Sequence, residues 1–304
     1  MAITLLSKYS AHNQFVLLQN QGSISKEDTR IPRIVHFVVG QGDRPNTQHR
    51  FTPSKPFMFL NYLIVLAARR QLRPEKIYIH YYTEPNTFWW NQTKQDPDIN
   101  VTLVKTRLVE SIFNRSLDHH AHRGDIMRLE VLINYGGIYF DTDVLALRSF
   151  ESLRNLSDVV MANQDYDTKT ACSAVIIAKK NASFLRRVYD AYQSFDEGCW
   201  DCHSVRITGE LATIYSHEVK LLPTASFFSP GWYEPDLFFR NNSYNFSSNY
   251  ASHLWNTVNN DELIELVPET ILRGNFTLAR MLLHAIGKNK LTALQKIFTQ
   301  ISQS

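Results

Sequence analysis

The chain has few cysteines, little net charge and no long apolar run, and each shortage excludes a class of protein. Its 304 residues include three cysteines, too few and odd in number for a disulfide framework. The net charge at pH 7 is +3, which is too weak to indicate nucleic-acid binding. No run of about 18 apolar residues occurs, so no membrane-spanning helix is expected. The first residues, MAITLLSKYSAHNQF, have too short an apolar region for a signal peptide.

Two of the three cysteines, Cys199 and Cys202, stand close together in the sequence CWDC. No second pair of ligands at finger-like spacing accompanies them, which argues against structural zinc. We expect them to be reduced thiols, with a loop disulfide and a zinc-binding pair as the alternatives.

Asparagine sequons for N-glycosylation exceed the roughly three matches that chance predicts from this composition. The excess favours a glycosylated chain in the secretory-pathway (Golgi) lumen, whereas the missing leader leaves the cytoplasm open. The sequons on which this expectation rests begin at Asn91, Asn114, Asn155, Asn181, Asn241, Asn245 and Asn275.

The first part of the chain alternates short β-branched segments with longer amphipathic or apolar ones, which predicts a parallel, doubly wound α/β sheet. We expect a polar tail at 1–30, one α/β domain at 31–265 and a helical extension at 266–304. The expected strands of the first half are RIPRIVHFVVG, KIYIHYY and INVTLVK, and the expected helices are FMFLNYLIVLAARRQL and PNTFWWNQTKQ.

The strongest helical pattern, DHHAHRGDIMRLEVLINYGG, ends in a glycine pair, and the short apolar strand IYF follows it. Two carboxylates, Asp141 and Asp143, come directly after that strand. Open α/β sheets bind ligands beyond the carboxyl ends of their strands. Two neighbouring carboxylates repel each other, so a hard cation such as Mn²⁺ or Mg²⁺ is expected between them. A turn in which the aspartates only cap the next segment is the alternative.

Asp125 and Arg128 lie three residues apart on the preceding helix and therefore share one face. The helix, the glycine turn and the strand can bring both back over the same pocket. There Arg128 can pair with a phosphate and Asp125 with sugar hydroxyls. A surface ion pair of little energetic value is the alternative.

The segment HRGDIMRLEVLINYGGIYFDTDV resembles the DXD block of glycosyltransferase family 32. The block comprises an aspartate, an arginine three residues later, a glycine pair, a tyrosine and Asp-X-Asp. IPRIVHFVVG resembles the family's opening strand, YASHLWNTVNND its late His-X-Trp block, and TGELATIY a block that usually reads Thr-Gly-Pro. The resemblance spans about residues 31–260. Where many relatives carry an aromatic that stacks on the base, this chain has Val38 and Val39.

The resemblance implies a GT-A-type, Rossmann-like fold and a retaining transfer of a hexose or N-acetylhexosamine to an acceptor hydroxyl. The donor is a nucleotide-diphosphate sugar, with a UDP-sugar favoured over GDP-mannose, and the acceptor is a glycan, glycolipid or glycoprotein. The cofactor implied is Mn²⁺ or Mg²⁺. Asp141, Asp143 and Arg128 are the implied catalytic group. Asp141, Asp143 and His253 are the implied metal ligands. The implied donor-binding residues are Asp125, Arg128, Tyr139, His36, Val38 and Trp255.

Two other functions compete with this one. YFDTDVL also matches the motif of haloacid-dehalogenase-like phosphatases, although that motif usually stands near the start of its domain. A non-catalytic sugar- or nucleotide-binding relative is the second alternative, kept open by Val39. Acceptor specificity is expected in the loops 41–56 and 227–250, whose aromatics Trp232, Tyr233, Phe238 and Phe239 can stack on sugars or belong to the core.

Overall fold

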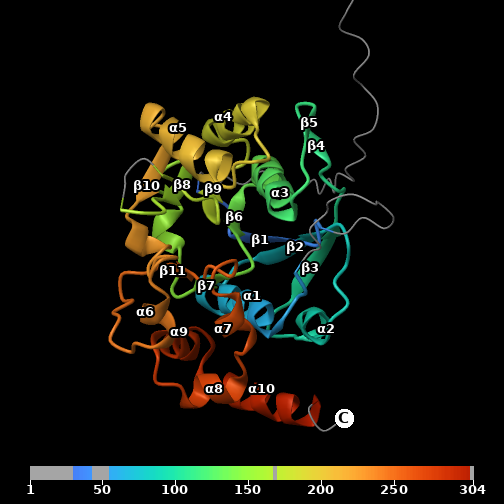
Figure 1. Ribbon diagram of the computed structural model, residues 1–304, viewed down its shortest axis with the longest axis vertical. Coiled ribbons are helices and arrows are strands. Elements are labelled where there is room, and N and C mark those ends of the chain that lie inside the picture. The colour runs from blue at the N-terminus through green and yellow to red at the C-terminus, as the bar shows by residue number, and fades with distance from the viewer. Residues whose placement is uncertain (1–29, 43–54, 167–169, 302–304) are drawn as a thin grey trace, which may run out of the picture.

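The structure is a computed structural model that describes residues 30–42, 55–166 and 170–301 (Figure 1). The expected tail, apart from Arg30, and most of the loop 41–56 lie outside the described residues.

A seven-stranded sheet with the order β10-β8-β9-β6-β1-β2-β3 forms the centre of the molecule (Figure 1). The strands expected in the first half of the chain are confirmed, and β6 follows the glycine pair as predicted. All neighbouring pairs are parallel except those of β9 with β6 and β8. The strands are β1 Ile34–Val39, β2 Lys76–Tyr81, β3 Val101–Lys105, β6 Gly137–Phe140, β8 Val159–Ala162, β9 Val175–Ala178 and β10 Val219–Leu222.

Helices cover both faces of this sheet, which confirms the expected α/β, Rossmann-like architecture. In Figure 1, α3, α4 and α5 lie on one side, and α1, α2 and the C-terminal helices lie on the other. Alternate side chains of β6 enter different cores, with Ile138 and Phe140 on the α1 side and Tyr139 on the α3 side. The helices are α1 Phe59–Leu72, α2 Phe88–Gln95, α3 His120–Tyr135, α4 Ser183–Ala191, α5 Thr208–Ile214, α6 Pro235–Phe239, α7 Asn260–Ile264, α8 Pro268–Arg273, α9 Thr277–Ile286 and α10 Lys288–Ile301.

Two small strand pairs accompany the main sheet. One joins β7 Val144–Ala146 to β11 Ala251–His253 in antiparallel register, with His253 opposite Val144. The other joins β4 Ser111–Ile112 to β5 Arg115–Ser116. The pairing of β7 with β11 matters for function, because it brings a segment more than a hundred residues away beside the aspartates that follow β6.

The glycine pair Gly136–Gly137, at the junction of α3 and β6, lets the chain approach neighbouring backbone more closely than a residue with a side chain could. Gly136 (φ 66°) and Gly137 (φ 109°) both adopt backbone angles that side chains disfavour. A Cβ on Gly136 would lie 2.5 Å from the backbone nitrogen of Lys180, and one on Gly137 would lie 2.6 Å from the carbonyl oxygen of Ile34 in β1. The pair therefore fixes where β6 starts, and with it where the aspartates emerge.

Replacing Gly137 by alanine is expected to lower the free energy of unfolding by about 3 kcal/mol, because the added methyl meets backbone and the φ angle becomes strained. Urea denaturation measures the change. Gly124→Ala is the matched control: Gly124 lies within α3 with no atom nearer than 4.0 Å to a new Cβ. It is expected to gain up to about 1 kcal/mol from helix propensity. Equal effects of the two substitutions would contradict the role given to Gly137.

The C-terminal helices belong to the same hydrophobic core as the sheet. Leu278, Met281 and Leu282 of α9 are fully buried in the cluster that contains α1 and β1. On α10, Phe298 packs against Phe59 of α1 at a ring-centroid distance of 4.9 Å. These helices therefore pack on the α1 face of the sheet as part of the same core.

Cys199 and Cys202 form a disulfide, so the expectation of reduced thiols is wrong. Their separation by two residues in a loop lets the sulfurs meet, which sequence spacing alone did not decide. Cys172 is free and buried. Over the described ranges, the helices are too short or too polar to cross a membrane.

Candidate functional site

A large cleft opens over the ends of the central strands and contains most of the residues singled out from the sequence. Its volume is about 1310 Å³. One part lies beyond β1 and β2 and is lined by Val39, Gly40 and Thr83–Thr87. The other part lies toward β8 and β9 and is lined by Gln164, Asp165 and Ser173. Asp141 and Asp143 follow β6, which stands between β1 and β9, and both line the cleft.

Backbone contacts on both sides fix the turn that carries the two aspartates. The N–H of Asp141 donates to the carbonyl of Ala174 (2.9 Å), and the carbonyl of Asp141 accepts from the N–H of Val144 (3.1 Å). From α1, the Asn61 side chain donates to the carbonyl of Thr142 (3.0 Å). The carboxylates are therefore held in place by the fold before any ligand binds.

Arg128 of α3 is paired with two carboxylates at once. Its Nη2 lies 3.0 Å from Oδ1 of Asp125 and 3.0 Å from Oδ1 of Asp141. Nη1 donates to the hydroxyl of Ser173. Its guanidinium carbon lies 4.9 Å from the ring centroid of Tyr139, whose hydroxyl donates to Asp141 (2.7 Å). The helix, turn and strand thus bring Asp125 and Arg128 back to Asp141, as the sequence spacing indicated.

The strand pair β7–β11 supplies His253 and the turn after it. Nε2 of His253 lies 3.2 Å from Oδ2 of Asp143. The same carboxylate oxygen accepts from the N–H of Asn256 (2.8 Å). Trp255, between them, has φ 54°, a left-handed conformation that is rare for a bulky residue and costs free energy. With Trp255 in this conformation, the backbone N–H of Asn256 points toward Asp143. The Trp255 indole donates to the carbonyl of Pro230 (3.0 Å).

Burial and charge act in opposite directions on these groups. Burial raises the pKa of Asp125 to about 6, and Arg128 only partly opposes it. Burial also raises the pKa of Asp141, against the opposing charge of Arg128. For Asp143, burial is outweighed by the charge and hydrogen bond of His253, which hold its pKa below the usual range. Burial alone would lower the pKa of His253, but Asp143 raises it to about 10. Burial thus disfavours the ionised forms of Asp125 and Asp141, whereas the contact between Asp143 and His253 favours the charged forms of both partners.

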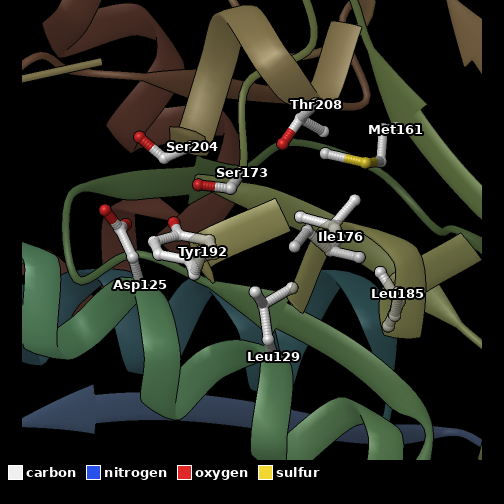
Figure 2. Close-up of a pocket in the computed structure, with 10 residues that line it drawn as sticks. Asp125, Leu129, Met161, Ser173, Ile176, Leu185, Tyr192, Ser204 and Thr208 are labelled. Carbon is white, nitrogen blue, oxygen red and sulfur yellow. The ribbon is translucent and has the colours of Figure 1, made fainter. Parts of the chain in front are cut away.

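Behind Asp125 a small enclosed cavity separates α3 from α4 and α5 (Figure 2). Its volume is about 10 Å³, close to that needed for one water molecule. Figure 2 shows the oxygens of Asp125, Ser173 and Ser204 near one end and apolar side chains such as Leu185 at the other. Ser204 and Asp125 both line this cavity. The cavity is too small for substrate, so the face of Asp125 that meets ligands is the one in the large cleft.

The donor set at the cleft fits a hard divalent cation. One oxygen each from Asp141 and Asp143 and a ring nitrogen of His253 all lie within 4.8 Å of one another. Carboxylate oxygens with one imidazole suit Mn²⁺ or Mg²⁺ better than the softer thiophilic metals, and His253 has to release the proton that Asp143 favours before its ring nitrogen can bind the ion. Arg128 pairs with Asp125 and Asp141, so its single charge compensates Asp141 only in part.

One residue expected to bind the donor lies elsewhere. The His36 ring is fully buried beneath the glycine turn, 3.0 Å from His80 Nε2 and 3.0 Å from the carbonyl of Gly136. His36 and Val38 share one face of β1, but His36 lies two residues further from the carboxyl end of the strand, against the glycine turn, whereas Val38 lies near that end and lines the cleft. Of the aromatics left open, Trp232 lines the cleft and Tyr233 is exposed, but Phe238 is core and Phe239 packs against it.

Several residues of the site were not singled out from the sequence. Lys55 lines the cleft, donates to the carbonyl of Asn256 (2.9 Å) and lies near enough to Asp143 to interact with its charge. Trp200, in the disulfide loop, also lines the cleft. Nothing in the local sequence around Lys55 or Trp200 indicates a role in binding. Only their positions in the folded structure place them in the cleft wall.

Residues 14–165 match the model of a family described as a glycosyltransferase sugar-binding region containing a DXD motif. The chain is 30% identical over 273 residues to glucan organizing enzyme 1 of Cryptococcus neoformans, an alignment that covers 86% of this chain and 72% of that protein. This chain belongs to the DXD-containing glycosyltransferase family. The family match decides against the phosphatase interpretation and makes the protein a transferase.

The glycosyltransferase also overlays on solved structures of the same general kind. PaToxG glycosyltransferase is 14% identical, with a TM-score of 0.44, over 88% of this chain and 87% of that one. The galactosyltransferase LgtC, solved with donor and acceptor sugar analogs, is 12% identical with a TM-score of 0.40, over 87% and 95% of the two chains. At this level of identity the overlays concern the fold and say nothing of substrates.

Proposed function

We propose that this glycosyltransferase moves a hexose or N-acetylhexosamine from a UDP-sugar to a hydroxyl of a glycan, glycolipid or glycoprotein, with retention of configuration. The observation that carries the proposal is the group formed by Asp141, Asp143 and His253 at the centre of the cleft, beside the paired Asp125 and Arg128. The name of the fungal relative makes a glucose-containing glycan the first acceptor to try.

The two parts of the cleft suggest how the donor lies. The first strands of a Rossmann-like sheet bind the nucleotide beyond their carboxyl ends, so we assign the base and ribose to the part lined by Val38, Val39 and Thr83–Thr87. Asp141, Asp143 and His253 would hold the divalent cation. Trp255, beside His253 in the cleft wall, would flank the donor near its phosphates.

Positive side chains near the diphosphate have different tasks in this proposal. Arg128 is engaged by Asp125 and Asp141, so it positions Asp141 and holds Asp125 toward the donor sugar. Lys55 is exposed at the cleft mouth, where its ammonium group donates to the carbonyl of Asn256. In the proposed complex it donates to a phosphate oxygen of the donor instead, and the exchange leaves no buried group without a hydrogen-bond partner. When bound, the divalent cation supplies charge that stabilises the departing diphosphate.

Retention of configuration needs no protein nucleophile in this arrangement. The sugar–phosphate bond breaks, the acceptor oxygen bonds to the anomeric carbon from the same face, and the departing phosphate oxygen takes the acceptor's proton. The residues of the site then orient donor and acceptor and exclude water, which supplies most of the rate enhancement by proximity and fixed charge.

Calorimetric titration of the purified chain with UDP and with GDP, each with and without Mn²⁺, tests the proposal. We expect UDP to bind only when Mn²⁺ is present, and to bind more tightly than GDP. Tighter binding of GDP would replace the UDP-sugar by GDP-mannose as donor. Failure of both nucleotides to bind with Mn²⁺ present would contradict the transferase proposal and favour a non-catalytic relative. Incubation with UDP-sugars and analysis of released UDP then identifies the sugar.

A further inference from the structure

The cleft is larger than one nucleotide sugar requires, and its second part carries aromatic side chains. Its volume of about 1310 Å³ exceeds the usual range for a single small-molecule site. Beyond the aspartates, on the side of β8 and β9, the walls include Trp200, Trp232 and Arg206. Since the donor nucleotide is assigned to the opposite side, this part remains for the second substrate.

Trp200 and Trp232 are the two exposed tryptophans of the described residues. They are 52% and 46% exposed, whereas Trp90, Trp89 and Trp255 are 0%, 9% and 8% exposed. An indole left in water forgoes the burial free energy of a large aromatic surface. The Trp200 side chain therefore has apolar surface available for a ligand in the cleft.

The loop that carries Trp200 is fixed at several points. The Cys199–Cys202 disulfide closes it around Trp200 and Asp201. Its carboxylate Glu197 accepts from the N–H of His119 (2.7 Å) and lies 3.2 Å from Nδ1 of His122. The Trp200 indole meets the His119 ring edge-to-face at a centroid distance of 4.9 Å. An exposed side chain held this firmly loses little conformational freedom when it binds a ligand.

The same loop is joined directly to the site at the aspartates. After Cys202, the carbonyls of Ser204 and Val205 accept from the N–H groups of Ser173 (3.2 Å) and Ala171 (3.1 Å). The Ser173 hydroxyl accepts from Arg128, which pairs with Asp125, and Ser204 and Asp125 line the same small cavity. The position of Trp200 relative to Asp125 is thus set by a short chain of contacts.

We propose that Trp200 is a stacking platform for a sugar ring of the acceptor glycan, held at a fixed place by the Cys199–Cys202 disulfide. Pyranose rings present a face of C–H groups that packs on an aromatic face, and their hydroxyls hydrogen-bond to polar groups at its edge. Asp201 and Arg206 form such a polar edge, joined to each other at 3.0 Å, and both line the cleft. The inference rests on the proposed sugar transfer and names where its acceptor binds.

Calorimetry with neutral trisaccharides tests this inference. The probes are maltotriose, laminaritriose and mannotriose, titrated into the chain in the presence of Mn²⁺ and UDP. We expect one or more to bind, and Trp200→Ala to raise its Kd about tenfold while leaving the Kd of UDP unchanged. Trp200→Phe, which keeps an aromatic face, is expected to recover most of the affinity. Phe113→Ala is the matched control, because Phe113 is similarly exposed (43%) and does not line the cleft.

The outcomes separate the two proposals. UDP binding with Mn²⁺, combined with trisaccharide affinities that Trp200→Ala leaves unchanged, would overturn the platform and leave the proposed transferase standing. UDP binding with no binding of any of the three trisaccharides would also overturn the platform. Absence of UDP binding would overturn both.

Reduction of the disulfide gives a second test of the same inference. Cys199→Ser combined with Cys202→Ser, or treatment of the wild type with a phosphine reductant, is expected to raise the trisaccharide Kd several-fold. The Kd of UDP is expected to change little, because the nucleotide is assigned to the part of the cleft on the other side of β6. Unchanged trisaccharide binding after reduction would show that the disulfide does not position Trp200.

Discussion

Replacing Asp143 by asparagine is expected to abolish Mn²⁺-dependent binding of UDP and to reduce sugar transfer by on the order of 10³-fold. Asparagine keeps the shape of the side chain and can still accept from the N–H of Asn256. It loses the negative charge that pairs with His253 and that, in the proposed site, holds the cation. Calorimetry measures the binding, and release of UDP from the donor measures the transfer.

Asp158→Asn is the matched control for this experiment. It makes the same chemical change at a carboxylate that is 61% exposed, pairs with Lys179 and does not line the cleft. It is expected to leave both binding and transfer unchanged. Metal-dependent UDP binding that survived Asp143→Asn at wild-type strength would show that the cation sits elsewhere.

Replacing Arg128 by methionine is expected to destabilise the folded protein by about 3–5 kcal/mol, because it leaves the buried Asp125 and the half-buried Asp141 without their shared partner. The Arg128 and Asp125 side chains are only 8% and 10% exposed. Urea denaturation measures the loss. The loss is expected to shrink as the pH falls, because protonation of the two carboxyls removes the uncompensated charge, and burial already raises both of their pKa values.

A second substitution separates lost charge pairing from lost packing. Adding Asp125→Asn to Arg128→Met removes one of the stranded charges and is expected to recover part of the stability. Arg240→Met breaks an exposed pair with Asp236 and is expected to cost about 1 kcal/mol or less. If Arg128→Met cost no more than Arg240→Met, Arg128 would not be the buried partner that the structure describes.

The alternation of strands and helices in the first hundred residues was enough to predict the α/β sheet, because apolar periodicity reports local structure directly. It could not predict that β9 runs antiparallel. SAVIIAKK is a short apolar run, and such a run does not indicate whether the strand will pair in a parallel or an antiparallel direction. The direction depends on how the chain returns after β8, which involves contacts distant in sequence.

Some residues of the candidate site could also be predicted from local sequence, and others could not. Asp125, Arg128, Asp141 and Asp143 could be grouped from spacing, since one helix, one turn and one strand connect them. His253 joins them only through the pairing of β7 with β11, so resemblance to a family was needed to include it. His36 was included by the same resemblance, but it lies in the middle of β1 against the carbonyl of Gly136, too far from the carboxyl end of the strand to line the cleft. Lys55 and Trp200 depend on tertiary placement alone.

The packing of α9 and α10 against α1 has a consequence for how the protein folds. The side chains of α1 that cover the sheet, among them Phe59, acquire their last neighbours from residues more than two hundred positions later. During synthesis the early strands and α1 therefore emerge with an incomplete core and exposed apolar surface. We expect nascent chains that stop before α9 to depend on chaperones, and the cooperative folding step to wait until these last helices have been made.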